Sequence, residues 1–300
     1  MKHYSVMLKE CLELLDIKED GIYVDGTLGR GGHSEEIAKR LKNGKLYTFD
    51  LDKTAIEESK TRLKDYSNIT YINDNYANMA NYLEEKVDGI LLDLGVSSPQ
   101  FDDGDRGFSY RFDGPLDMRM DQSQDLKASN IVNTYKEEEI ANILYTYGEE
   151  KNARRIAKAI VNNRPINTTF ELVEVIKKAL PQKVLNKKGH PAKQTFQALR
   201  IKTNNELASL EYFLDNFDEL LNHDGRVVII SFHSLEDRLV KKAFKQRTTI
   251  KVDKYIPLRP EEIKDLSYEL LNHRVIEASD EELNENHRSQ SAKLRGIRKI

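Results

Sequence analysis

The glycine-rich segment at residues 22–34 constrains the fold more than any other part of the sequence. Apolar or β-branched residues lead into Asp25, four glycines follow within seven positions, and an amphipathic run begins at His33. This order predicts a strand, a glycine loop and the N-terminus of a helix. Glycine permits positive φ angles and lacks the Cβ that would keep a ligand away, and a helix N-terminus offers N–H donors to an anionic group. A ligand-binding turn and a purely structural turn both fit this segment taken alone.

Strand-like and helix-like stretches alternate through the first third of the chain. Strands are predicted at residues 22–25, 45–50, 69–73 and 87–93, and helices at 5–16, 34–42, 53–64 and 76–85. Short apolar strands interleaved with helices predict an α/β fold with a parallel, doubly wound sheet. The pattern stops after Leu94, and residues 97–125 are predicted as loop because they are polar, rich in Asp and Gly, and interrupted by proline.

Helical patterns then dominate to about residue 220. Helices are predicted at residues 136–147, 149–163, 169–180 and 194–220, an apolar strand at 225–232, a helix at 235–245, and candidate last strands near 250–255 and 292–299. These stretches predict a sheet domain interrupted by a helical insertion between its fourth and fifth strands. We expect the sheet domain to comprise residues 1–104 and 221–300, and the inserted helical domain to comprise residues 105–220.

Composition places the chain among soluble globular proteins. Hydrophobic residues make up 39% and charged residues 32% of its 300 positions. We find no apolar run of the roughly 20 residues that a membrane helix needs, and no apolar core of signal-peptide type at the N-terminus. The expected location is the cytoplasm. The single cysteine, Cys11, excludes an internal disulfide and a multi-cysteine metal site, and its helical apolar pattern predicts a core position. No metal is expected.

Charge is distributed unevenly along the chain. The net charge is −3, but residues 151–202 hold 13 Lys and Arg against two acidic residues, a local balance of +11 that leaves −14 elsewhere. This asymmetry predicts a surface that faces a polyanion. The basic residues proposed to contact this polyanion are Lys187, Lys188, Lys193 and Arg200, with Phe196 beside the last two.

Polar side chains follow each of the first four predicted strands. Ligands of a doubly wound sheet bind beyond the carboxyl ends of the strands. Asp50 lies about 20 residues after the glycines, the spacing of a carboxylate that accepts hydrogen bonds from ribose hydroxyls. Asp52 competes for that role, but Asp50 follows the apolar strand directly. Tyr76 is a candidate to pack on an adenine, and Asp93 ends the fourth strand.

Two nucleotide cofactors fit this layout. A nicotinamide dinucleotide fingerprint would need glycine at position 34, which is Ser34, so the acidic residue and glycines at 25–32 are closer to the loop of S-adenosylmethionine enzymes. The segment Ser98-Pro99-Gln100-Phe101 is similar to a motif of methyltransferases that act on the exocyclic amines of bases. Acceptor groups against the N–H bonds pull an aromatic amine toward tetrahedral geometry, and an aromatic ring holds the base flat.

A closer resemblance extends along almost the whole chain. It is carried by DGTLGRGGHS at 25–34, LLDLGVSSPQ at 91–100, RGFS at 106–109, DGPLDMRMD at 113–121, YGEE at 147–150, HPAKQTFQALRI at 190–201 and ISFHSLEDR at 230–238. These stretches resemble the bacterial small-subunit ribosomal RNA cytosine-N4 methyltransferases, the MraW family. The resemblance implies a class I methyltransferase fold with a helical insertion, S-adenosylmethionine as methyl donor, and a decoding-centre cytidine of 16S rRNA in the small ribosomal subunit as acceptor.

The same resemblance implies the site residues. Cofactor contacts are expected at Gly31, Gly32, His33, Asp50, Tyr76, Asp93 and Gln100. We expect residues 98–101 to form the site of the substrate amine. The sequence identifies no general base. The aspartates at 113, 117 and 121 either accept ligand groups or brace their loop through Arg111 and Arg119.

Further alternatives remain open from the sequence. Ser234 and Asp237 form a plausible helix-capping box. His233, directly before them, either points toward the cleft or belongs to the cap. A nicotinamide-dependent oxidoreductase and a non-catalytic RNA-binding factor of ribosome assembly are the alternative functions.

Overall fold

The chain folds into two compact units, each with its own core. The structure is a computed structural model that describes residues 5–249 and 266–300. The sheet unit comprises Met1–Gly95 and Leu207–Ile300, and the helical unit comprises Val96–Glu206. Both limits of the helical unit therefore precede the expected domain limits at residues 105 and 220. The assignment of separate functional roles to the two domains stays a prediction.

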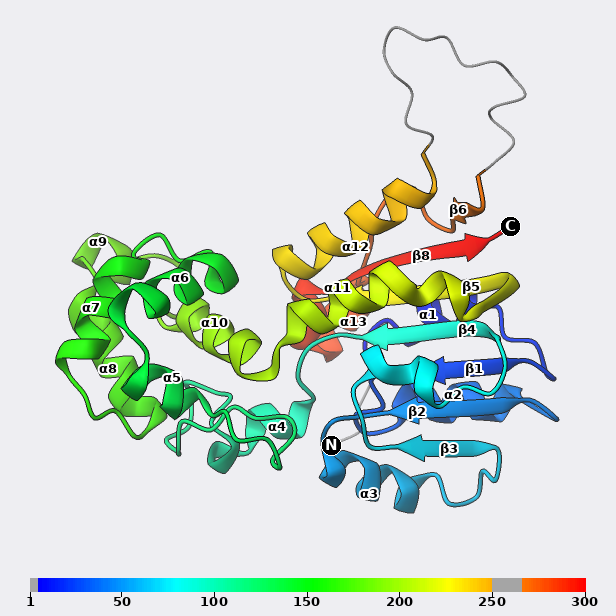
Figure 1. Cartoon of the computed structure of the whole chain (residues 1–300), viewed down its shortest axis with the longest axis horizontal. Helices are drawn as coiled ribbons and strands as arrows, with labels where there is room; N and C mark the ends of the chain where they lie inside the picture. The colour runs from blue at the N-terminus through cyan, green and yellow to red at the C-terminus, as the bar shows by residue number, and fades with distance from the viewer. Residues whose placement is uncertain (1–4, 250–265) are drawn as a thin grey trace, which may run out of the picture. The chain divides into compact units, whose positions relative to one another are not determined.

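The sheet unit is built on an open, mixed sheet (Figure 1). The strand order is β3 (Ile69–Ile72), β2 (Lys45–Phe49), β1 (Ile22–Asp25), β4 (Val87–Asp93), β5 (Leu221–Ser231), β8 (Lys293–Lys299) and β6 (Tyr268–Leu270), with β7 (Ile276–Glu277) also paired to β8. Strands β1 to β5 run parallel, and β8 is antiparallel to β5, β6 and β7. The predicted parallel α/β sheet is confirmed, with an antiparallel edge added by the tail. The strand expected near 250–255 lies outside the described residues.

Helices cover both faces of this sheet because its central strands are apolar on both sides. One face packs against η1 (Tyr76–Asn81), α11 (Glu206–Asn216) and α12 (Ser234–Arg247), and the other against α1 (Leu8–Leu15) and α2 (Gly32–Arg40). Neighbouring residues of a strand alternate between the two cores, as Val24 and Tyr23 do in β1. Cys11, a residue of α1, is fully buried, which confirms its predicted core position.

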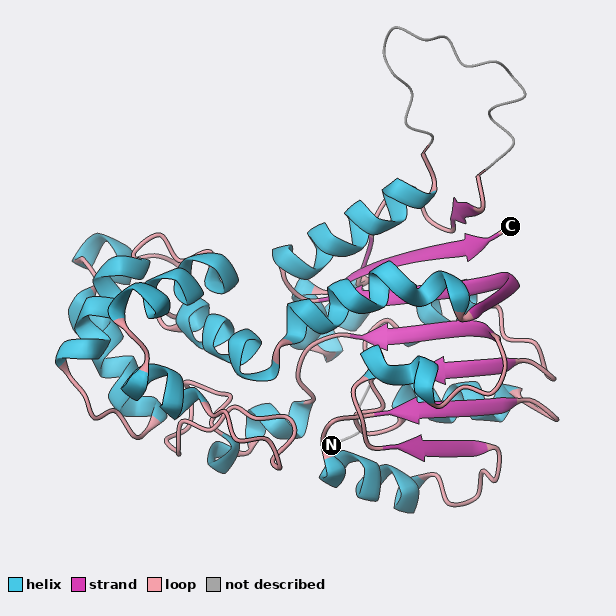
Figure 2. Cartoon of the chain, viewed as in Figure 1, coloured by secondary structure: helices cyan, strands magenta, loops and turns pink. Residues whose placement is uncertain are grey.

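The helical unit consists of helices joined by loops (Figure 2) and has its own apolar core. Its elements are α4 (Ser98–Asp102), η2 (Gly104–Arg106), α5 (Ala128–Thr134), α6 (Glu137–Gly148), α7 (Ala153–Asn162), α8 (Thr169–Ala179), α9 (Gln182–Leu185) and α10 (Lys193–Asn204). Helix α7 shows why the insertion is stable, because Ile156 and Ile160 are fully buried on one side while Arg155 and Lys158 are exposed on the other. The predicted helical insertion is confirmed.

The single helix predicted at residues 194–220 is in fact two helices. The break occurs at Asn205, which adopts a left-handed backbone with φ 52° between α10 and α11. Asparagine tolerates this conformation better than most residues. After the break, Leu210 and Phe213 of α11 pack into the core of the sheet unit. The chain therefore leaves the helical unit at the break, well before residue 220.

Candidate active site

The carboxyl ends of the central strands are tied to the loop that follows β1. The backbone N–H of Gly26 donates to the carbonyl of Leu91 in β4 at 2.9 Å. The hydroxyl of Thr27 accepts a hydrogen bond of 2.6 Å from the N–H of Asp93, the last residue of β4. Sequence reasoning did not identify Thr27, which occupies an ordinary loop position. These bonds hold the glycine loop over the strand ends where a ligand of this fold is expected.

The glycines of the loop are required by the protein's own packing. Gly31 has a φ of 73°, and a Cβ at this position would lie 2.9 Å from Leu63. A Cβ on Gly32 would lie 2.0 Å from the hydroxyl oxygen of Ser5. Helix α2 begins at Gly32, directly after this turn. A side chain at Gly31 would strain the turn because of its positive φ, and one at Gly32 would have to move the Ser5 side chain, so glycine lets the N–H donors of the helix start lie close to the strand ends.

The carboxylate of Asp25 holds the two ends of the glycine loop together. Its carboxylate is buried and accepts hydrogen bonds from the Ser34 hydroxyl at 2.6 Å and the Thr27 N–H at 3.1 Å. Burial raises the pKa of Asp25 above its ordinary value. Ser34, which replaces the last glycine of a dinucleotide fingerprint, therefore has a definite role in holding the strand end against the helix.

Asp50 and Asp52 have different partners. The two oxygens of Asp50 accept hydrogen bonds from the N–H groups of Gly29 and Asp52, both at 2.8 Å. Burial raises the pKa of Asp50 to about 6. Asp52 caps α3 (Lys53–Arg62) by accepting from the Thr54 N–H at 3.0 Å. A carboxylate has about four acceptor positions, so Asp50 can still accept from ligand hydroxyls.

Asp93 carries an unsatisfied acceptor. Its Oδ1 is buried and has no hydrogen-bond partner within the described part of the chain, whereas Oδ2 lies 3.8 Å from Nδ1 of His33. Burial raises the pKa of Asp93 to about 7, while His33 acts in the opposite direction. A buried oxygen without a partner is uncommon and suits a donor group on a bound ligand.

Tyr76 lies beside the same loop. A Cβ on Gly26 would be 3.0 Å from the Cβ of Tyr76, and the Tyr76 ring meets Phe213 edge-to-face with centroids 6.0 Å apart. The expected cofactor residues of the sheet unit thus lie together at the carboxyl ends of the parallel strands. They are Gly31, Gly32, His33, Asp50, Tyr76 and Asp93. Their contacts with a cofactor stay a prediction.

The predicted substrate segment belongs to the helical unit. Residues 98–101, which were expected to be loop, form most of the short helix α4. Ser97 precedes this helix, and its N–H donates to Oε1 of Gln100 at 3.0 Å, with Pro99 in the first turn. Phe101 packs against the helical core. The signal that was missed is this local cap, which stabilises a helix within a polar stretch.

The predicted RNA contacts divide into exposed and buried residues. Lys187, Lys188 and Lys193 are exposed. Arg200 instead forms a two-bond ion pair with Glu206, with both distances 2.9 Å, and its side chain is only 12% exposed. We therefore leave Arg200 out of the RNA surface. The expected surface position of Phe196 is wrong, because its side chain is buried in the helical core.

The capping box predicted at Ser234 and Asp237 is wrong by one residue. His233 is the N-cap of α12, and its Nδ1 accepts from the Glu236 N–H at 3.4 Å. The buried Glu236 carboxylate in turn accepts from the N–H of Phe232 at 2.8 Å and lies 3.0 Å from Nε2 of His233. Of the two alternatives for His233, the structure shows the capping role. Asp237 pairs with Arg295 at 2.7 Å.

The polar loop after α4 is braced internally. Asp117 accepts from Arg119 at 2.8 and 2.9 Å, and Arg119 also donates to two loop carbonyls. Asp113 accepts from the N–H groups of Gly114 and Phe170. Asp113 and Asp117 therefore both brace the loop, which is one of the two alternatives left open for them. Arg111 is not the partner in either of these contacts.

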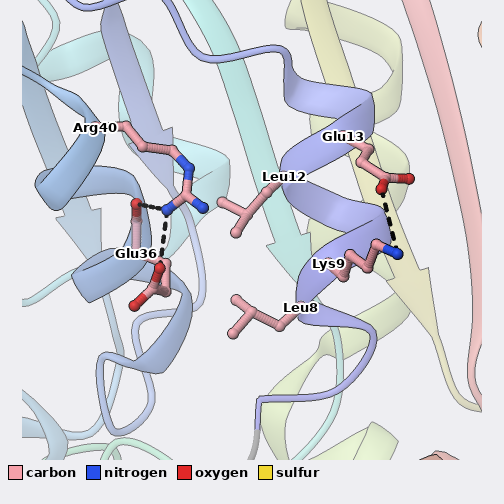
Figure 3. Close-up of a pocket in the computed structure, with 6 residues that line it drawn as sticks. All are labelled: Leu8, Lys9, Leu12, Glu13, Glu36 and Arg40. Atoms are coloured by element: carbon pink, nitrogen blue, oxygen red, sulfur yellow. Dashed lines mark hydrogen bonds and ion pairs between the residues drawn. The ribbon is translucent and has the colours of Figure 1, made fainter.

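A separate open groove of about 520 Å³ lies in the sheet unit between α1 and α2 (Figure 3). It is lined by Leu8, Lys9, Leu12, Glu13, Glu36 and Arg40. Arg40 donates to Glu36 at 2.9 Å on one side, and Lys9 lies 3.9 Å from Glu13 on the other. None of these residues belongs to the expected cofactor set, so the groove is distinct from the loop described above.

Features of two other classes of protein are absent from the residues that the structure describes. Within residues 5–249 and 266–300, no helix has the length and apolar character of a membrane span. The same residues contain no group of three or more His, Cys, Asp or Glu side chains placed to hold a metal ion.

Comparison with known proteins identifies the family. The sequence matches the MraW methylase family over residues 1–300. It is 53% identical over 305 residues to ribosomal RNA small subunit methyltransferase H of Mesoplasma florum, covering 99% of both chains. The proteins of the same name from Clostridium botulinum and Finegoldia magna are 52% and 50% identical, covering all of this chain and 99% of theirs. The chain therefore belongs to the MraW methylase family, and it is an S-adenosylmethionine-dependent methyltransferase rather than an oxidoreductase or a non-catalytic factor.

Proposed function

We propose that this chain methylates the exocyclic N4 amine of a decoding-centre cytidine in 16S rRNA of the small ribosomal subunit. The observation that carries the proposal is the identity of about half the residues, over the full length, with enzymes named for small-subunit ribosomal RNA. The substrate implies that the enzyme acts in the cytoplasm. We assign the sheet unit, Met1–Gly95 and Leu207–Ile300, to cofactor binding and the helical unit, Val96–Glu206, to substrate recognition.

The residues present fit S-adenosylmethionine. Oδ1 of Asp93, which has no hydrogen-bond partner among the described residues, offers a buried acceptor, and Asp50 has acceptor positions left for hydroxyl groups. The turn at Gly31 and Gly32 presents the start of α2, where N–H donors suit a carboxylate. We propose that His33, Tyr76 and Gln100 complete the contacts. When bound, the cofactor supplies a methyl group made electrophilic by its sulfonium.

The proposed acceptor explains the residues at 98–101. The lone pair of a cytosine amine is delocalised into the ring, so this nitrogen is a weak nucleophile. We propose that the segment Ser98-Pro99-Gln100 supplies acceptor groups for the amine and that Phe101 holds the base flat. Since attack leaves the nitrogen positively charged, its proton is acidic and solvent can accept it. The proposal therefore needs no dedicated base and no cysteine nucleophile.

RNA binding is assigned to an exposed basic surface of the helical unit. Lys187, Lys188 and Lys193 lie in or beside the segment between α9 and α10, and all are exposed. Lysine contacts to phosphate release counterions, which favours binding of any RNA backbone. A stacked target base must also be extruded at a cost of a few kcal/mol, and such contacts help to offset it.

The test is to incubate the enzyme with labelled S-adenosylmethionine and small subunits that lack the modification, then to analyse the digested nucleosides. We expect label in N4-methylcytidine. Cys11→Ser should leave the product unchanged, because no covalent adduct is proposed. Label on carbon 5 of a pyrimidine or on a ribose would overturn the proposed chemistry, and label in large-subunit RNA alone would overturn the proposed substrate.

A further inference from the structure

The N-terminal segment lies directly on the glycine loop. We call residues 5–7 the N-terminal strap. The Ser5 hydroxyl occupies the space that a side chain on Gly32 would fill, since a Cβ there would be only 2.0 Å away. The next residue, Val6, places its carbonyl oxygen 3.0 Å from Nε2 of His33. The strap thus contacts two consecutive residues at the start of α2.

His33 connects the strap to the acceptor at the end of β4. Its Nε2 faces the Val6 carbonyl while its Nδ1 lies 3.8 Å from Oδ2 of Asp93. The His33 side chain is only 6% exposed, so the ring has little freedom to turn. The position of the strap therefore fixes the orientation of a ring that adjoins Asp93.

The strap is held in turn by the tail of the chain. The N–H of Met7 donates to Oε1 of Glu282 at 2.9 Å, across 275 positions of sequence. The hydroxyl of the buried Ser289 donates to the same oxygen. Glu282 lies in α13 (Asp280–Glu285), whose first turn is capped by Ser279. The N-terminal strap and the C-terminal segment around Ser289 therefore meet at the Glu282 carboxylate.

The backbone of the strap has a conformation that needs such support. Met7 has a φ of 51°, which is left-handed, and its side chain is fully buried. A residue with a side chain adopts this conformation at a cost, and it persists where its surroundings determine it. The bond to Glu282 and the burial of the side chain are two such determinants.

We propose that Glu282 is a positioning residue for the methyl donor: it holds the N-terminal strap against Gly32 and His33 and so pre-orders the cofactor loop. The inference rests on the proposed cofactor contacts at Gly32, His33 and Asp93. Without the carboxylate, the strap has to be ordered when the cofactor binds, and the free-energy cost of that ordering weakens binding. Within the residues that the structure describes, Glu282 forms no hydrogen bond with a proposed cofactor residue, although its charge is one of the causes that raise the pKa of Asp93.

Four variants separate positioning from general damage to the tail. Glu282→Ala removes the acceptor, whereas Glu282→Gln keeps an amide oxygen that can take the place of Oε1. Glu281→Ala is the matched control, because Glu281 is an exposed carboxylate in the same helix. Ser289→Ala removes one of the donors to Glu282 and provides a milder change in case Glu282→Ala does not fold.

The measurements are calorimetric titration with S-adenosylmethionine, steady-state kinetics and thermal unfolding without ligand. Glu282→Ala should weaken cofactor binding about tenfold, on the scale of a lost hydrogen bond to a charged group. The KM for the cofactor should rise by a similar factor while kcat at saturation is retained. Glu282→Gln should recover most of the affinity, Glu281→Ala should match the parent, and Ser289→Ala should show a smaller loss than Glu282→Ala.

Several results would overturn the positioning role. These are parental affinity in Glu282→Ala, an equal loss in Glu281→Ala, or a fall in kcat with an unchanged KM. If Glu282→Ala does not fold, parental affinity in Ser289→Ala has the same meaning. Failure of the underlying assignment is distinguishable, because then the parent itself would not bind S-adenosylmethionine, or Gly31→Val and Asp50→Ala would bind it normally.

Discussion

At the scale of single residues, the two aspartates after β2 allow a direct test of the cofactor assignment. Asp50→Ala should weaken S-adenosylmethionine binding by about 1.5–3 kcal/mol, the usual scale for hydrogen bonds to a charged group. Asp52→Ala removes the cap of α3 and should cost about 1 kcal/mol of folding stability with little change in affinity. Calorimetry and thermal unfolding of both variants are the measurements. If Asp52→Ala lost the affinity and Asp50→Ala kept it, the ribose partner would be Asp52.

The raised pKa of Asp93 predicts that the folding stability of the protein depends on pH. Burial raises its pKa to about 7, above the value of 3.8 expected for an unperturbed Asp. The folded state therefore binds a proton more tightly than the unfolded state, and the contribution of Asp93 to stability falls as pH rises from about 4 to about 7. Asp93→Asn should stabilise the ligand-free protein by about 1–3 kcal/mol at pH 8 and hardly at all at pH 4.

The measurement for this variant is denaturant unfolding of parent and Asp93→Asn across pH, followed by cofactor titration at pH 8. We expect the stability gain to accompany a loss of affinity, because a group kept for ligand binding is commonly a burden in the ligand-free state. A variant less stable than the parent at pH 8 would mean that the Asp93 carboxylate supports the fold.

At the scale of elements, the basic segment between α9 and α10 carries the RNA prediction. Changing Lys187, Lys188 and Lys193 together to Glu should reduce affinity for the small subunit and flatten its salt dependence. Each lost phosphate contact removes about 0.7–0.9 from the slope of log K against log salt. Affinity for S-adenosylmethionine should not change. Filter binding over a range of salt concentrations measures the effect.

A matched triple variant controls for net charge. Lys241, Lys242 and Lys245 are exposed on α12 in the sheet unit, and their change to Glu alters the total charge equally. An identical loss of slope in both variants would show that only overall charge matters. An unchanged slope in the first variant would move the RNA surface elsewhere, with the basic stretch at 293–299 as the next candidate.

Most elements could be predicted from the sequence, and the exceptions share a physical cause. Strands such as β1 and β4 are short, apolar and bounded by turn residues, so local patterns determine them. The breaks were harder. Asn205 interrupts a continuous helical pattern, and the ion pair between Arg200 and Glu206 spans that interruption. The cap at His233 was misplaced by one residue because Ser234 has the stronger intrinsic preference for that role.

At the scale of the whole molecule, local signals predicted the sheet and the inserted helices, but not the contacts that join distant parts of the chain. Asp50 and Asp93 could be predicted as ligand-binding residues because the carboxyl ends of parallel strands lie on the same side of a sheet. The bond from Met7 to Glu282 could not be foreseen, since neither residue lies in a distinctive pattern. The relation of residues 98–101 to the cofactor loop also stays a prediction.

The insertion has a consequence for synthesis. Strand β4 leaves the ribosome early, but its neighbour β5 begins only at Leu221. Until then the nascent sheet exposes an unpaired edge in which Ile90, Leu91 and Leu92 are all destined for burial. Such an edge favours wrong pairing with other chains. The helical unit is one continuous segment, so it can fold during this interval. The growing chain then holds an incomplete sheet unit beside a helical unit that is already compact.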